Sequence, residues 1–352
     1  MKNHRARGGR WGFLFGACVL ACAMSPVGRS AEPVRIVFDT DIGNDVDDVL
    51  ALAMLHALES RGHCRLLAVT STKDHPWSAP LVDVVNTFYG RPDIPIGAVR
   101  KGVTPSEGKF LGLAVEKKGK SWRYAHDLES GRQAPDATTL LRQTLAAAPD
   151  HSIVLVQVGF STNLARLLAS KPDTVSPLSG RDLIRKKVRF LSAMAGSFAP
   201  VPGHVRHREY NVVQDLKAAR AVLTSWPTPM IASGYEIGIR VRFPHESIEK
   251  DFAYTADHPV AECYRRYCEP DHDRPCWDLT SVLVAVYPDR GYFTLSPPGR
   301  IHVAEDGYVF FEEDPKGNCR YLRMSAVQQA RVREALVQLA SQPPGANAGD
   351  AR

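Results

Sequence analysis

Five aspartates lie within ten residues near the N-terminus, and their side chains are the residues in the chain best suited to chemistry. They are Asp39, Asp41, Asp45, Asp47 and Asp48. One or two of them could cap a helix N-terminus, but capping does not need five. Carboxylates this crowded repel one another unless a cation or hydrogen-bond donors compensate their charge. Such oxygen ligands favour a hard divalent cation, Ca²⁺ or Mg²⁺.

The residues on either side of the aspartates predict where these lie in a fold. An apolar run covers residues 34–38, and an apolar pattern with helical spacing begins at Val49. A β-branched run, then Gly43, then helical periodicity predict a strand, a turn and a helix. The acids then follow the C-terminal end of a strand, where open α/β sheets keep their sites.

Residues 39–48 resemble the N-terminal signature of the inosine-uridine preferring nucleoside hydrolase family, in its longer variant Asp-Thr-Asp-Ile-Gly-x-Asp-x-Asp-Asp. Four later pieces match that family in the correct order, at residues 158–163, 194–196, 209–211 and 277–278. The resemblance covers about residues 34–286. It implies an enzyme that hydrolyses the N-glycosidic bond of a ribonucleoside with the help of Ca²⁺.

The same resemblance implies a calcium site made of three carboxylates and one backbone carbonyl, from Asp41, Asp48, Asp278 and Val158. A carbonyl ligand requires no particular side chain, so a valine is acceptable there. Asp41 would also act as the general base toward a bound water. The ribose hydroxyls would be held by Asp47, Glu209 and Asn211, since carboxylates accept and an amide both donates and accepts.

Two departures from the family pattern leave roles open. Relatives often have a histidine immediately before the last aspartate, but this chain has Trp277. His272 or Asp271 could assist the departing base instead, or Trp277 could stack on it. Many relatives also have an asparagine near the sugar, where this chain offers Lys73 or Asp74.

Two other functions are alternatives to nucleoside hydrolysis. Asp39, Thr40 and Asp41 would also suit an aspartyl-phosphate phosphohydrolase, although Gly43 stands where that class has threonine or valine. A non-catalytic nucleoside- or sugar-binding protein would keep the ion without the reaction. Within the family resemblance, Asp39 is expected to brace the loop and Asp45 has no clear counterpart.

The rest of the chain alternates between strand and helix patterns. Predicted strands cover 35–39, 64–71, 94–99, 152–158, 188–194 and 229–233, and predicted helices cover 49–60, 79–89, 137–147, 162–170, 214–224 and 280–286. This alternation predicts an α/β fold, a mostly parallel sheet with helices on both faces. A small C-terminal β-hairpin (300–322) and a helix (325–341) follow, while 101–132 and 248–277 are expected to be loops over the sheet edge.

The first thirty residues have the pattern of a secretory signal peptide, with basic residues before an apolar segment at 11–24. We therefore expect a secreted or periplasmic domain over 31–341, a disordered tail at 342–352, and no stable membrane insertion. Lipoprotein anchoring at Cys22 is the alternative.

The leader also explains the apparent basicity. It holds five of the 44 Lys and Arg and none of the 38 Asp and Glu, which leaves 39 against 38. Such a balance gives no reason to expect a nucleic acid partner. The expected partner is a small-molecule nucleoside, and the resemblance implies a homodimer or homotetramer. Beyond the leader, Cys263, Cys268 and Cys276 could form a disulfide or, with His272, a zinc site.

Overall fold

Strand β1 (Val34–Thr40) is an interior strand of the sheet, and its residues from Ile36 onward are buried. It pairs in parallel with β2 (Cys64–Lys73) on one side and with β6 (Ile153–Gln157) on the other. Alternate residues of β1 contribute to two different apolar clusters, Ile36 and Phe38 to one and Val37 to the other. Both faces of the strand are therefore covered, as expected of a parallel sheet.

The computed structural model describes residues 1–2, 8–9 and 32–345. Most of the predicted signal peptide, the Cys22 alternative and most of the predicted tail lie outside the described residues. Within the described residues, no helix has the length and apolar character needed to cross a membrane.

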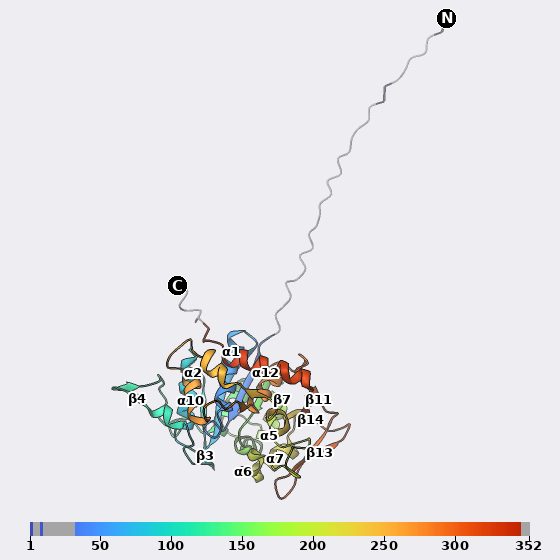
Figure 1. The fold of residues 1–352 in the computed structure, drawn as a ribbon. Helices are drawn as coiled ribbons and strands as arrows, with labels where there is room; N and C mark the ends of the chain where they lie inside the picture. The colour runs from blue at the N-terminus through green and yellow to red at the C-terminus, as the bar shows by residue number, and fades with distance from the viewer. Residues whose placement is uncertain (3–7, 10–31, 346–352) are drawn as a thin grey trace. The chain divides into compact units, whose positions relative to one another are not determined.

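The main sheet has the strand order β13-β12-β14-β8-β7-β6-β1-β2-β3, and β11 pairs with β14. The remaining strands of this sheet are β3 (Ile96–Val103), β7 (Val188–Met194), β8 (Met230–Ser233), β11 (Thr294–Leu295), β12 (Gly299–Val303), β13 (Val309–Glu313) and β14 (Cys319–Arg323). In this order, every two neighbouring strands from β14 to β3 pair in parallel. Strands β12 and β13 form the predicted antiparallel hairpin at one edge. Figure 1 shows β13 and β14 at one side of the domain and β4 (Lys117–Lys118) at the other. The predicted α/β fold is confirmed.

Helices cover the two faces of this sheet. One face carries α1 (Asp47–Ser60), α2 (Ser78–Phe88), α10 (Pro259–Tyr267), α11 (Asp278–Val286) and α12 (Ala326–Ala340). The other carries α3 (Ala137–Ala147), α4 (Thr162–Ala169), α5 (Gly180–Lys187) and α7 (Leu216–Ser225). Short elements complete the fold: η1 (Leu111–Val115), α6 (Tyr210–Gln214), α8 (Tyr235–Gly238), α9 (His245–Lys250), and the small sheets β4 (Lys117–Lys118) with β5 (Ser121–Trp122) and β9 (Arg242–Phe243) with β10 (Arg274–Pro275).

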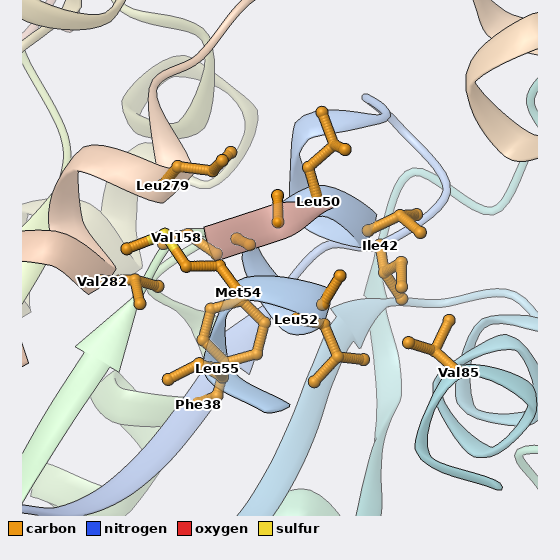
Figure 2. Packing of buried hydrophobic residues seen from close by; sticks show 14 of the residues in the cluster. Phe38, Ile42, Leu50, Leu52, Met54, Leu55, Val85, Val158, Leu279 and Val282 are labelled. Carbon is orange, nitrogen blue, oxygen red and sulfur yellow. The ribbon is translucent and has the colours of Figure 1, made fainter. Parts of the chain in front are cut away.

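The packing of α1 against α11 places the acidic residues. Figure 2 shows Leu279 and Val282 of α11 near Met54 of α1, and all three are buried without exposed surface. Full burial of one such side chain contributes about 1.5–3 kcal/mol to folding. Because α1 begins at Asp47 and α11 begins at Asp278, their N-termini are held together beside the end of β1.

One expectation about the fold was wrong, since α10 lies in the stretch 248–277 predicted as a loop. Its buried Val260, Cys263 and Tyr264 have helical spacing, and Pro259 stands at its first turn. The disulfide and zinc alternatives for the nearby cysteines were also wrong. Cys64, Cys263, Cys268, Cys276 and Cys319 are free thiols, and no zinc ligand group forms around them in the described chain.

Candidate active site

One cavity of about 590 Å³ opens where the strands β1, β6 and β7 end. All nine residues that the sequence predicted for the site line it, namely Asp41, Asp47, Asp48, Val158, Glu209, Asn211, His272, Trp277 and Asp278. The first and the last of them are more than 200 positions apart in the sequence. The sheet and the packing of α1 on α11 bring them together. Their individual roles stay predictions.

Three carboxylates form the tightest group in the cavity. Asp47, Asp48 and Asp278 each offer an oxygen within 4.8 Å of the others, and all three are buried. The pKa values of Asp48 and Asp278 are raised well above the ordinary range, mainly by burial and to a lesser extent by the charges of the neighbouring carboxylates. Buried oxygens that repel one another are the donors that a hard divalent cation would satisfy, so these residues fit such an ion.

Asp41 borders this group. Its charge raises the pKa of Asp48 and of Asp278, and burial raises the pKa of Asp41 itself to about 6. Its carboxylate accepts a hydrogen bond of 2.7 Å from the side-chain amide of Asn44. Gly159 lies directly behind it, since a Cβ there would overlap the backbone nitrogen of Asp41. Asn44 therefore orients the carboxylate of Asp41, and the close approach of Gly159 restricts its backbone.

A buried lysine orients Asn44. The Lys73 Nζ donates to Asn44 Oδ1 at 2.7 Å and to the backbone carbonyl of Thr104 at 3.1 Å. Because Oδ1 of Asn44 accepts from the lysine, its Nδ2 is turned toward Asp41. Lys73 is 1% exposed and does not line the cavity, but its charge acts to lower the pKa of Asp41.

Asp47 has one oxygen committed to the backbone. Its Oδ2 accepts from the backbone nitrogens of Trp277 at 2.9 Å and Asp278 at 3.2 Å, at the start of α11. Asp47 therefore ties the N-terminus of α11 to that of α1. Its other oxygen is the one available to a ligand.

Glu209 and Asn211 form a second polar wall after β7. Glu209 caps α6 by accepting from the backbone nitrogens of Asn211 and Val212, and burial raises its pKa to about 7. The Asn211 amide donates to the Val158 carbonyl at 2.7 Å. A carbonyl oxygen has two lone pairs, so the Val158 carbonyl keeps one for a further partner.

Aromatic and cationic side chains line the side of the cavity around Trp277. Its indole stacks on Tyr235 with ring centroids 5.4 Å apart and donates Nε1–H to the Tyr235 carbonyl at 3.0 Å. Tyr267, His272 and Arg274 complete this side. Asp271 does not line this cavity.

Asp39 and Asp45 have separate places. Asp39 is 1% exposed, lies outside the cavity, and accepts from Thr70 Oγ1 and, at 2.8 Å, from Asn163 Nδ2. It therefore braces neighbouring strands and loops. Asp45 lines the cavity and forms an ion pair with Arg274.

Sequence reasoning missed several cavity residues, chiefly Asn44, Tyr235, Tyr267 and Arg274. Asn44 could have been found, because it lies inside the aspartate motif. The others lie on α8, α10 and β10, outside the matched motifs. Only the position of Arg274, three residues before Trp277, offered a signal.

Several solved structures share the fold of this chain. A plant nucleoside hydrolase is 20% identical, with a TM-score of 0.65 over 88% of this chain and 100% of its own. An inosine-uridine preferring nucleoside hydrolase from Bacillus anthracis is 18% identical, with a TM-score of 0.66 over 88% and 99%. A purine-preferring ribonucleoside hydrolase from Gardnerella vaginalis is 16% identical, with a TM-score of 0.63 over 88% and 99%.

Among curated proteins, a sequence search found no match to this chain. The solved structures share its fold, at identities that speak for the fold alone. The sequence profile of one family, in contrast, matches residues 36–334 and so takes in every cavity residue described above. On that match, the chain belongs to the inosine-uridine preferring nucleoside hydrolase family.

Proposed function

We propose that this chain hydrolyses the N-glycosidic bond of a ribonucleoside, with a resident Ca²⁺ and with Asp41 as the general base. The observation that carries the proposal is the convergence of Asp47, Asp48 and Asp278 within 4.8 Å, beside Asp41, in one cavity. A volume of about 590 Å³ lies in the range of small-molecule sites.

The ligands proposed for the ion are Asp41, Asp48, Asp278 and the Val158 carbonyl, with Asp47 close enough to join or replace one of them. They are oxygen donors only, which favours Ca²⁺ over softer metals. When bound, such an ion supplies positive charge that holds sugar hydroxyls and lowers the pKa of a water.

The side chains of the protein would carry out the remaining steps. Glu209, Asn211 and the free oxygen of Asp47 hold the ribose hydroxyls and fix the sugar. Asp41, oriented by Asn44, accepts a proton from the attacking water. The water oxygen bonds to C1′, the C1′–N bond breaks, and its electron pair leaves with the base. Buried carboxylates next to the sugar stabilise the positive charge that develops at C1′.

The two alternatives fare differently. An aspartyl-phosphate enzyme would need Asp39 as an accessible nucleophile, but Asp39 is buried outside the cavity and hydrogen-bonded to Thr70 and Asn163. That alternative is therefore not supported. A non-catalytic binding protein would use the same cavity, so only a measurement of turnover separates it from a hydrolase.

The test is ribose release by the purified mature protein from a panel of nucleosides, with Ca²⁺ and with a calcium chelator. We expect release in Ca²⁺, its loss in the chelator, and a loss of about 10²–10⁴-fold in Asp41→Asn. Asp182→Asn, at an exposed site on α5, is the matched control and should keep full activity. Ribose binding without release, unchanged in Asp41→Asn, would instead support the binding protein.

A further inference from the structure

On the side of the cavity expected to hold the base, neither Trp277 nor Asp271 supplies a free proton donor. The Trp277 indole N–H already donates to the Tyr235 carbonyl at 3.0 Å. Asp271 does not line the cavity. His272 does line it, so this histidine is the competing candidate.

Arg274 lines the same side and is held rigidly. Its Nε donates to Asp45 Oδ1 at 3.1 Å and its Nη2 donates to Asp45 Oδ2, a two-point contact with one carboxylate. The guanidinium also lies over the rings of Tyr267 and Trp277, at 5.0 and 5.4 Å from their centroids. Such pairing and stacking leave the guanidinium little freedom to move.

One edge of this guanidinium remains available. Asp45 and the Tyr267 hydroxyl take hydrogen bonds from Nε and Nη2, whereas Nη1 has no hydrogen-bond partner among residues 32–345. A half-buried cation with free N–H groups, fixed beside Trp277, is suited to stabilising negative charge.

We propose that Arg274 stabilises the departing base by hydrogen bonding from its guanidinium, and that Asp45 is the residue that positions it. This inference rests on the proposed nucleoside hydrolysis. As the C1′–N bond breaks, the electron pair moves onto the base, whose nitrogen or carbonyl oxygen accepts the hydrogen bond. Arg274 keeps its proton, because a guanidinium is not deprotonated in proteins. The base takes its proton from solvent, and the water proton passes to Asp41.

A leaving group that needs no help provides the test. Inosine and p-nitrophenyl β-D-ribofuranoside share the sugar, but p-nitrophenolate is stable as an anion. We expect Arg274→Met to lower kcat/KM for inosine by about 10²–10³-fold and for the nitrophenyl riboside by less than about 5-fold. Asp45→Asn should show the same preference with a smaller loss, about 10-fold for inosine.

Two further variants make the test decisive. Arg265→Met removes another ion-paired arginine, on α10 and outside the cavity, and should change neither substrate. His272→Gln tests the competitor. Equal losses on both substrates in Arg274→Met, or a selective loss in His272→Gln alone, would overturn the inference. Failure of the wild-type protein to release ribose from any nucleoside of the panel would overturn the proposed function itself, and the inference with it.

Discussion

Replacing Lys73 by methionine tests whether the acidic loop depends on a buried cation. Methionine fills a similar volume, so the substitution removes mainly the charge and three hydrogen-bond donors. It leaves Asn44 Oδ1 and the Thr104 carbonyl without the donor that now lies 2.7 and 3.1 Å away. Asn44 and Thr104 are half-buried, so at about 0.5–1.5 kcal/mol for each lost hydrogen bond the expected loss is about 1–3 kcal/mol in the free energy of unfolding.

Activity should also fall in Lys73→Met. Without the lysine, Asn44 Oδ1 loses its donor, and its Nδ2 is held only by the 3.2 Å contact with Thr104 Oγ1 and by Asp41 itself, so the proposed general base is oriented less firmly. We expect kcat to drop about 10- to 100-fold, as small misplacements of catalytic groups do.

Two measurements check this prediction: urea unfolding of the chelated protein, and kcat for ribose release in Ca²⁺. Lys250→Met is the matched control, because Lys250 is exposed and its ion pair is with Glu246 on the same helix turn. Its unfolding midpoint should stay close to that of the wild type. If Lys73→Met also kept the wild-type midpoint and kcat, Lys73 would have no part in holding Asp41.

Two further predictions concern other parts of the fold. His56 is fully buried beside Asn86, and burial lowers its pKa to about 3. An unfolded histidine titrates near 6.5, so the contribution of neutral His56 to the free energy of unfolding is complete above that pH and declines toward pH 3 by up to about 1.4 kcal/mol per pH unit. His56→Gln should therefore flatten the pH dependence of the free energy of unfolding, measured with urea between about pH 6 and pH 4. An unchanged slope would contradict this prediction. Gly159→Ala would push against the backbone of Asp41, so we expect about 1–3 kcal/mol lower stability and at least about 10-fold lower kcat, whereas Gly131→Ala, with ordinary contacts only, should match the wild type in both measurements.

The local features of the site were predictable from sequence. The apolar run of β1, the glycine turn and the helical pattern of α1 lie within about thirty residues, and neighbouring residues largely determine such elements. Family membership confirms the prediction of a ribonucleoside N-glycosyl hydrolase. The motif order also placed Glu209, Asn211 and Asp278 at one cavity.

The contacts between distant segments could not be predicted. Asp45 and Arg274 are 229 positions apart and meet only because β10 ends beside the start of α11. Lys73 reaches Asn44 across 29 positions, from the end of β2. Neither pair leaves a pattern in a single sequence, because each depends on how strands and helices pack. The stretch containing α10 was misjudged for a different reason, since its short apolar stripe is interrupted by charged residues.

The most direct test of the central claim is a calorimetric titration of the chelated mature protein with Ca²⁺. We expect one ion to bind per chain, and ribose release to return as the site fills. In the double variant Asp48→Asn with Asp278→Asn, both the binding and the recovery of activity should be lost, because the two carboxylates belong to the group within 4.8 Å. No binding by the wild type, or the same binding by the double variant, would contradict a calcium site built on these carboxylates.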